Sequence, residues 1–238
     1  DSNYDRIPQT SEIKLSKAPA YIHMTSNNTI FGTQWQQLPE FPGIPLVADM
    51  SSDILSRAFD VSKFDLIYAG AQKNLGPSGV TVVLISPEML AKVNKNIPVI
   101  FQYSVFAKNN SLYNTPPSFS VYLVNLMLKW LKGNGGLTAM EQRNKEKAAY
   151  IYDAIDNSNG FYRGHAQKDS RSLMNVTFRL PNEELETIFV SEAKKAGLVG
   201  VKGHRSVGGM RASIYNAMPM AGCKLLADLM SDFAKRNG

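Results

Sequence analysis

Short apolar runs alternate with polar or glycine-rich segments along the first part of the chain. The runs lie at residues 21–24, 45–49, 65–69 and 80–85 and are rich in aliphatic and β-branched side chains. Such runs, bounded by Gly, Pro, Asn or Ser, favour buried β-strands. Thr29, Asp49 and Lys73 each lie at or just after the end of one run. Because the carboxyl ends of parallel strands share one edge of a sheet, we expect these three residues to converge there.

Helical spacing follows this strand-rich part. Residues 87–92 predict a short helical turn, and a loop then extends to Pro117. Apolar residues recur at helical spacing at positions 119, 122, 123, 126, 127, 130 and 131. This stripe predicts a core-facing helix that ends at the glycines of residues 133–136. Thr138 and Glu141 match a capping box, which predicts that the next helix begins at Thr138 and reaches about Ile155.

The remaining pattern predicts a strand at 173–178, a helix at 183–196, a strand at 208–213 and a helix at 219–235. Residues 1–20 are polar and irregular, and we interpret them as an exposed lead-in. The whole chain is therefore assigned to the α/β class. The glycine-rich joint suggests two domains, residues 1–136 and residues 137–238, the second being a small α/β domain.

The small-residue turn from Ala69 to Gly79 carries a single lysine, Lys73. A phosphate-binding P-loop is excluded, because that motif places its lysine directly after the last glycine and follows it with a hydroxyl residue. The arrangement suits an amine that forms an imine with a carbonyl, as in Schiff-base and pyridoxal phosphate catalysis. Asp49 could then face the pyridine nitrogen of that cofactor. Two structural interpretations remain open: Lys73 as a solvated loop residue, and Asp49 as the cap of a helix near Ser51.

Near the end of the chain, His204, Arg205 and Arg211 surround the turn at residues 208–209. The planar fork of arginine suits carboxylate and phosphate groups, so this cluster is a candidate anion site. The alternative is ordinary surface charge.

Three separated segments together resemble phosphoserine aminotransferases, which are pyridoxal phosphate enzymes of the class V aminotransferase family. The segments are Ala48-Asp-Met-Ser-Ser52, Gln72-Lys-Asn-Leu-Gly-Pro-Ser-Gly79 and the run from Gly203 to Pro219. They occur in the family's order and spacing, and the resemblance extends from about Tyr21 to the end. It implies the fold of type I pyridoxal phosphate transferases, with an incomplete large domain built on a mainly parallel sheet and a small C-terminal α/β domain. A large part of the family's cofactor domain has no counterpart in this chain.

The resemblance also implies a role for individual residues. Lys73 would be the catalytic lysine, and the cofactor would be bound by Thr29, Asp49, Gln72, Lys73, Asn114 and Thr115. Asn114 and Thr115 would reach the cofactor phosphate of a neighbouring subunit, which implies a homodimer with shared sites. Arg211 would bind the α-carboxylate of the substrate. His204 and Arg205 would bind the distal phosphate, or the γ-carboxylate of glutamate.

The first functional hypothesis is an aminotransferase that moves an amino group between glutamate and 3-phosphohydroxypyruvate in serine biosynthesis. The second is a catalytically silent fragment, or a dimerisation module, of such an enzyme. A third, another pyridoxal phosphate enzyme such as a lyase or desulfurase, is weaker because Cys223 lies near a predicted helix rather than in a catalytic loop.

Composition agrees with a globular chain of 238 residues and 44% hydrophobic content. The net charge of +6 suits anionic small molecules. The basic residues are scattered, without an RNA-recognition signature, so no nucleic-acid partner is expected. No run is long enough to span a membrane, and we recognise no signal sequence, metal site or disulfide. A lone Cys223 fits a reducing compartment, and we expect the protein in the cytoplasm.

Overall fold

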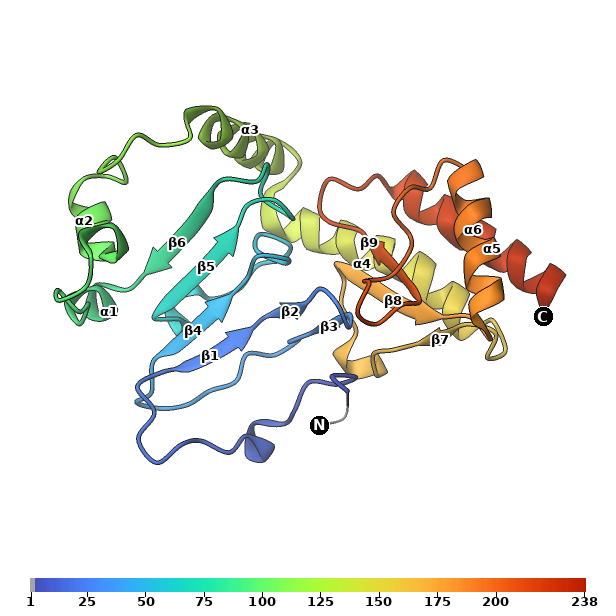
Figure 1. Ribbon diagram of the computed structural model, residues 1–238, viewed down its shortest axis with the longest axis horizontal. Helices are drawn as coiled ribbons and strands as arrows, with labels where there is room; N and C mark the ends of the chain where they lie inside the picture. The colour runs from blue at the N-terminus through green and yellow to red at the C-terminus, as the bar shows by residue number, and fades with distance from the viewer. Residues whose placement is uncertain (1–2) are drawn as a thin grey trace.

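A computed structural model describes residues 3–238, and its first layer is a four-stranded sheet (Figure 1). The strand order is β1 (Ile22–Thr25), β4 (Leu46–Asp49), β5 (Leu66–Gly70) and β6 (Thr81–Ile85). The first three strands are parallel, whereas β6 is antiparallel to β5. The reason is local: the turn between β5 and β6 contains no crossover helix, so the chain returns directly beside the strand it has just left. The expected strands and the mainly parallel sheet are confirmed.

The interior of this sheet layer is a compact apolar cluster. Met24, Ala48, Ile67 and Ala69 contribute from the strands and are at most 5% exposed. Ala48 and Ala69 are fully buried. The central strands β4 and β5 therefore form a rigid base for the turns that leave their carboxyl ends.

Three helices follow β6: α1 (Pro87–Ala91), α2 (Tyr103–Lys108) and α3 (Ser118–Gly133). The end of α3 at the glycines agrees with the sequence, but the predicted core stripe of this helix is wrong. Phe119, Tyr122 and Trp130 are 72%, 55% and 37% exposed. Only Val124 and Leu131 of α3 are buried. Helical spacing defines one apolar face, and in this structure most of that face has nothing packed upon it.

Helix α4 (Gly136–Asp156) leads into the C-terminal part and packs along α6 (Met220–Asn237). The predicted capping box at Thr138 is wrong. The helix already begins at Gly136, and its N-cap is Gly135, whose φ of +92° is accessible to glycine without strain. No side chain caps this end.

The C-terminal part contains a second sheet in the order β7 (Arg163–Gly164), β8 (Asn175–Arg179), β9 (Met210–Ser213), entirely antiparallel. Helix α5 (Glu183–Lys195) joins α4 and α6 around it. Its core is rich in edge-to-face aromatic contacts, including Tyr162 with Phe178 and Phe189 with Phe233. The predicted strands and helices of this part are confirmed to within a few residues.

A buried polar seam joins the two parts. The short antiparallel pair β2 (Asn27–Asn28) and β3 (Thr33–Gln34) lies here. The amide of Asn27 donates to Ser52 Oγ at 2.8 Å and to Asn175 Oδ1 at 2.9 Å. Gln34 donates to Asp53 and accepts from the backbone N–H of Leu173. Because buried polar groups cost stability when unpaired, these bonds fix how the strands of one part meet the other.

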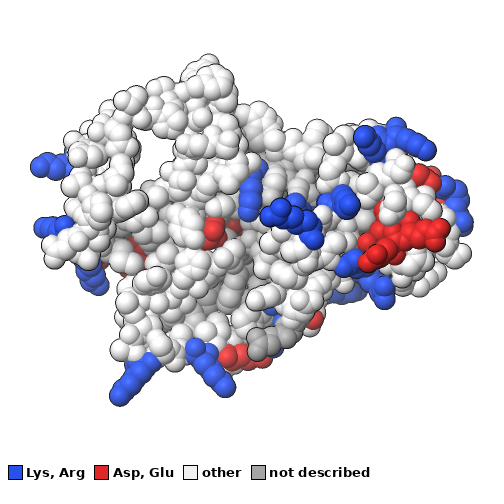
Figure 2. Space-filling view, viewed as in Figure 1, with Lys and Arg blue, Asp and Glu red and all other residues white. Residues whose placement is uncertain are grey.

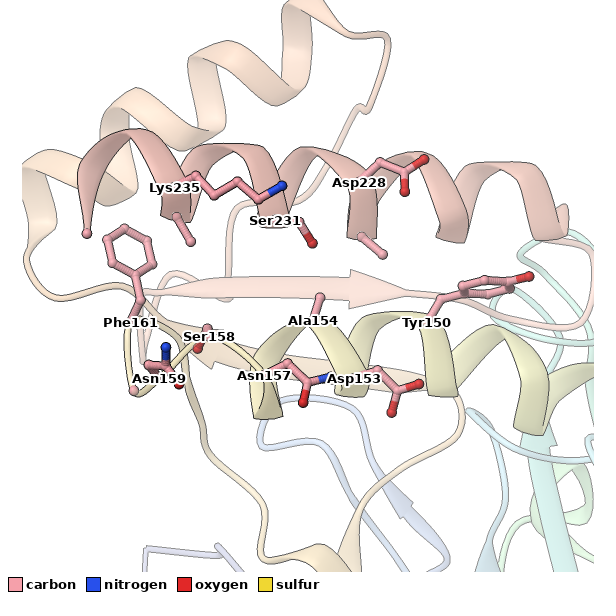
Figure 3. Close-up of a pocket in the computed structure, with 14 residues that line it drawn as sticks. Tyr150, Asp153, Ala154, Asn157, Ser158, Asn159, Phe161, Asp228, Ser231 and Lys235 are labelled. Carbon is pink, nitrogen blue, oxygen red and sulfur yellow. The ribbon is translucent and has the colours of Figure 1, made fainter.

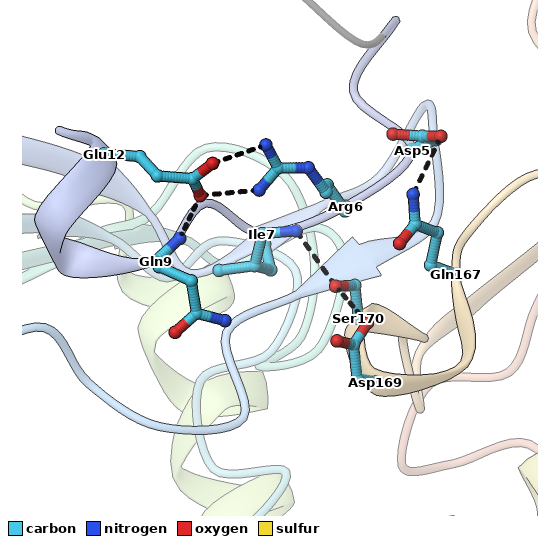
Figure 4. A network of polar contacts seen from close by, with 8 residues as sticks. All are labelled: Asp5, Arg6, Ile7, Gln9, Glu12, Gln167, Asp169 and Ser170. Atoms are coloured by element: carbon cyan, nitrogen blue, oxygen red, sulfur yellow. Dashed lines mark hydrogen bonds and ion pairs between the residues drawn. The ribbon is translucent and has the colours of Figure 1, made fainter.

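The segment before β1 is largely exposed, as expected, and includes the 3₁₀ helix η1 (Thr10–Glu12). It is nevertheless attached to the C-terminal part (Figure 4). The backbone N–H of Ile7 donates to Ser170 Oγ at 2.9 Å, and Gln167 donates to Asp5. Other short 3₁₀ turns are η2 (Val61–Lys63), η3 (Val99–Phe101) and η4 (Lys168–Ser170).

Lysine and arginine side chains are distributed over the face shown in Figure 2, with an acidic group at the end where α5 lies. Within residues 3–238, no helix is long and apolar enough to cross a membrane. The same residues contain no cluster of three or more His, Cys, Asp or Glu side chains suited to a metal ion.

Candidate functional site

Lys73 is held by the turn between β5 and β6. The backbone N–H of Ala71 donates to Val80 O at 2.9 Å, which closes the base of this turn. On the far side of the lysine, Asn74 is buried and donates to Ile54 O at 2.6 Å. Leu75 is buried in the core beneath. Anchored on both sides, the turn presents Lys73 as a half-buried side chain at the carboxyl edge of the sheet.

Thr29 links Lys73 to the C-terminal sheet. Lys73 Nζ donates to Thr29 Oγ1 at 2.8 Å. Arg211, on β9, directs its Nη1 to the carbonyl oxygen of Thr29 at 3.5 Å, a weak contact. The predicted convergence of Thr29 and Lys73 is therefore observed, and a third predicted residue, Arg211, lies beside them.

The electrostatic setting of Lys73 favours a more readily deprotonated amine. Partial burial lowers its pKa, the carboxylate of Asp49 opposes this effect, and the positive charge of Arg211 lowers the pKa further. Burial disfavours the charged form of an amine because the ammonium loses hydration. A solvated loop lysine, the alternative raised by the sequence, would show neither this burial nor the bond to Thr29.

Asp49 ends β4, and its carboxylate caps a turn rather than a helix. Oδ1 accepts the backbone N–H of Ser51 at 2.8 Å, and the hydroxyl of Ser51 accepts the N–H of Gly70 at 3.0 Å. The capping interpretation was right about the contact but wrong about the helix, because residues 51–57 form turns and bends. Burial and the neighbouring Asp49 raise the pKa of Tyr68, on the adjacent strand.

Ser51 was missed in the sequence analysis. It ties the end of β4 to the end of β5, and so fixes the two turns that carry Asp49 and Lys73. The signal that could have identified it is the Asp-x-Ser spacing, in which a carboxylate accepts the N–H two residues on.

Gln72 is exposed, and its amide folds back over Gly70. A Cβ placed on Gly70 would lie 2.7 Å from Gln72 Oε1. Asn114 and Thr115 lie elsewhere: both are exposed and line a cavity of about 590 Å³ with residues of β6 and α2. Gln72 lies next to Lys73 because the two residues are neighbours in the chain. Asn114 and Thr115, in contrast, do not join the group around Thr29.

Arg211 and His204 share a cavity of about 330 Å³ between β8, β9 and the loop at residues 203–209. Within the described residues, Arg211 Nε is buried and has no hydrogen-bond partner, while the residue lines this cavity. Arg205 is exposed and does not line this cavity. Two of the three predicted anion-binding residues are thus together.

A wider groove of about 740 Å³ lies between α4 and α6, with Tyr150, Asp153, Asp228 and Lys235 on its walls (Figure 3). None of the predicted site residues lines it.

Cys223 is buried in α6 at 1% exposure, and burial raises the pKa of its thiol. A protonated, inaccessible thiol is a poor nucleophile, which argues against the desulfurase hypothesis.

Comparison with known proteins defines the class of the protein first. Residues 1–226 match the model of the family described as aminotransferase class-V. The chain belongs to this family, and its fold is that of type I pyridoxal phosphate transferases.

Individual relatives are more specific. The chain is 61% identical to the phosphoserine aminotransferase of Herpetosiphon aurantiacus over 236 residues, which are 99% of this chain and 66% of that protein. It is 60% identical to the phosphoserine aminotransferase of Bacillus subtilis, covering 99% of this chain and 65% of that protein. The similarity therefore includes the first twenty residues, which the sequence analysis had placed outside it. The chain spans about two thirds of the length of these relatives.

A solved structure agrees closely. The phosphoserine aminotransferase from Bacillus circulans subsp. alkalophilus superposes with a TM-score of 0.97 at 55% identity, over 100% of this chain and 66% of that one. The phosphoserine aminotransferase from Trichomonas vaginalis, solved with pyridoxal phosphate bound, superposes with a TM-score of 0.91 at 40% identity, over 97% and 65% of the two chains.

Proposed function

We propose that this protein is a pyridoxal phosphate-dependent phosphoserine aminotransferase. It would transfer an amino group between glutamate and 3-phosphohydroxypyruvate, giving phosphoserine and 2-oxoglutarate in serine biosynthesis. The observation that carries the proposal is the contact of Lys73 with Thr29 beside Arg211. It puts an amine with a lowered pKa near a guanidinium, a group suited to bind a carboxylate.

The residues present fit pyridoxal phosphate. Lys73 supplies an amine with a lowered pKa, and Asp49 supplies a carboxylate fixed by Ser51. When bound, this cofactor supplies an electron sink for the bonds at the substrate Cα. Thr29 and Gln72 lie near enough to Lys73 in the fold to contribute to holding it, and Asp49 would keep the pyridine nitrogen protonated.

The chemistry of the chain itself follows from these positions. Lys73 would take the proton from the substrate Cα and return a proton to the neighbouring carbon, a role that requires an amine able to lose its charge near neutral pH. Arg211 would bind the α-carboxylate, because it lines the cavity and its planar guanidinium matches a carboxylate. His204 and Arg205 would bind the distal phosphate or the γ-carboxylate of glutamate.

The partner is proposed to be a second copy of the chain. Exposed apolar side chains on β6, α2 and α3 form a surface that water solvates poorly, and the segment with Asn114 and Thr115 lies beside it. In a symmetric dimer these two residues could reach the other subunit's cofactor.

We also propose that the chain divides into two domains, residues 1–136 and residues 137–238. The cytoplasm remains the expected location.

The second candidate is a catalytically silent fragment or dimerisation module. It is favoured by one observation, that the chain spans 65–66% of its relatives' length. Cofactor binding separates the two candidates.

The first experiment uses purified protein incubated with pyridoxal phosphate, reduced with borohydride, and analysed by peptide mass spectrometry. We expect the cofactor mass on Lys73. A Lys73→Ala variant should lose transamination by at least about 10²-fold, because the anchor and the proton carrier are both removed. Lys92→Ala, at an exposed lysine after α1, is the matched control. An unmodified Lys73 in wild-type protein would favour the silent fragment.

The second experiment tests shared sites by mixing two inactive variants, Lys73→Ala and the double variant Asn114→Ala with Thr115→Ala. Random exchange of subunits between equal amounts of two C₂ dimers makes about half of all dimers hybrid. Each hybrid has one intact site out of two, so activity should recover to about a quarter of wild type. No recovery in a mixture shown to contain hybrid dimers would contradict sharing.

A further inference from the structure

The loop that carries His204 and Arg205 is closed on itself by backbone bonds. The N–H of Gly203 donates to Gly209 O at 2.7 Å, and the N–H of Gly208 donates to His204 O at 2.8 Å. Gly208 and Gly209 have φ values of +72° and +65°, which glycine adopts without strain. We call residues 203–209 the anion loop. The base of the loop is paired with β9, because the N–H of Arg211 donates to Val201 O at 2.8 Å and Lys202 pairs with Met210. The residues from His204 to Val207 lie beyond this pairing.

Arg179, the last residue of β8, makes a further contact between the sheet and the part of the anion loop beyond this pairing. Its Nη2 donates to the carbonyl oxygen of Val207, in the middle of the loop. The stem of the same side chain lies against the glycine turn: a Cβ on Gly209 would lie 2.8 Å from Arg179 Cδ. The two glycines are therefore needed both for their backbone conformation and for this close approach.

Glu186, on α5, holds the other arm of the guanidinium. Arg179 Nη1 lies 3.3 Å from both carboxylate oxygens of Glu186, whose side chain is 11% exposed. One arm of the fork is thus bound to a helix and the other to the loop. Arg179 lines the same cavity as His204 and Arg211, but its two terminal nitrogens are already occupied by protein oxygens. These two contacts suit Arg179 to hold the loop between β8 and α5.

The position of the loop decides how His204 is presented. His204 Nδ1 lies 2.6 Å from Ser206 Oγ and accepts the backbone N–H of Ser206 at 3.3 Å. Because Nδ1 is the acceptor of this bond, the neutral ring carries its proton on Nε2, where it can be donated outside the loop. A displacement of the loop would move this donor and Arg205 together, relative to Arg211.

We propose that Arg179 is a positioning residue that sets the distance between the distal-anion site, at His204 and Arg205, and the carboxylate site at Arg211. Through this distance, Arg179 selects substrates that carry a second anionic group. The inference rests on the proposed function. It goes beyond it by assigning substrate selection to a residue whose two terminal nitrogens are bound to the protein.

The test compares Arg179→Met, Arg179→Lys and a control in protein loaded with pyridoxal phosphate. Methionine keeps an apolar stem and removes the fork, whereas lysine keeps the charge but not two separated arms. The control is Arg163→Met, which removes an arginine directly opposite on the neighbouring strand β7. Arg163 contacts Leu180 O and does not line the cavity that contains His204.

Steady-state kinetics are the first readout. Arg179→Met should lower kcat/KM for phosphoserine about tenfold or more, mainly by raising KM, while kcat/KM for alanine changes less than about twofold. Arg179→Lys should resemble Arg179→Met, because the geometry of the fork, not its charge, is the cause. Equal losses for both substrates, or full activity of the lysine variant, would overturn the proposal.

Hydrogen exchange and calorimetry are readouts independent of turnover. The amides of Gly203 and Gly208 should exchange faster in Arg179→Met than in wild type or Arg163→Met. Unchanged exchange in Arg179→Met would overturn the loop-holding role.

Calorimetric titration with phosphoserine separates the proposed function from the proposed role of Arg179. Wild-type protein that binds phosphoserine without transamination contradicts only the proposed function. Wild-type protein that does not bind phosphoserine contradicts both.

Discussion

Lys147 provides a quantitative test of how the C-terminal part is held together. The side chain is fully buried in α4, and Nζ donates to the carbonyl oxygens of Ile214 at 2.9 Å and Tyr215 at 2.7 Å. These residues directly follow β9, the strand that carries Arg211. Burial lowers the pKa of Lys147 from 10.5 to about 8. A neutral amine still has two N–H donors, so both bonds can survive deprotonation.

The shift makes stability depend on pH in a defined direction. Between the folded pKa of about 8 and the ordinary 10.5, the unfolded chain binds more protons than the folded protein. The free energy of unfolding therefore rises with pH over this window, and the same stability is lost as the pH falls from 10.5 to about 8. Integrating this difference from about pH 7.5 to about pH 9.5 gives roughly 2 kcal/mol from Lys147 alone.

The variant Lys147→Met removes the titrating group and keeps a long apolar side chain. Urea unfolding at several pH values gives the difference in unfolding free energy between wild type and variant. Taking this difference cancels the contributions of titrating groups that both proteins share. We expect this difference to shift by about 2 kcal/mol in favour of wild type over that pH range. Lys145→Met, on the exposed face of the same helix, should show no comparable shift. A difference for Lys147→Met that stays constant to within about 0.5 kcal/mol would refute the reasoning.

Three further predictions concern the site and the seam. Arg205→Ala should weaken phosphorylated substrates far more than alanine, whereas Arg211→Ala should weaken all amino acids alike, each by about one to two decades in kcat/KM; equal losses throughout would contradict separate roles. Gly32→Ala should lower the unfolding free energy by about 1–3 kcal/mol, because φ is +73° and the added Cβ would lie 2.7 Å from Asn175 O. Gly43→Ala, with similar φ and nothing within 4 Å, isolates the backbone contribution, and equal losses would exclude the steric one. Cys223 should resist thiol reagents in the folded protein and react once it is unfolded; rapid labelling of native protein would show that its burial is wrong.

The anion site shows which functional residues can be identified from the sequence and which cannot. His204, Arg205 and Arg211 were identified from an arginine-rich glycine turn, and two of them do share a cavity. Arg179 was not identified, because an arginine at the end of a strand has no local signature. Its importance comes from Val207 and Glu186, which approach it from a loop and a helix.

Helix α3 shows a similar limit in the prediction of buried side chains from sequence. The spacing of its apolar residues predicted the helix and its end correctly, but it also predicted a buried stripe. Periodicity shows that one face is apolar; whether that face is covered depends on what packs against it. In this structure Phe119 and Tyr122 remain exposed, so the apolar pattern of this helix did not predict burial.

The sequence by itself determined the four strands of the first sheet, β8 and β9, the turn that presents Lys73 and the family to which the chain belongs. It did not identify the two-residue strands β2, β3 and β7. These features depend on short-range patterns: apolar runs, glycine turns and motifs read within a few residues. Only the tertiary structure decided that Thr29 joins Lys73, 44 positions along the chain, to Arg211, 182 positions along it. It also decided that β6 is antiparallel and that α3 is uncovered. The physical reason is that contacts between distant residues depend on which surfaces meet, and a local pattern does not contain that information.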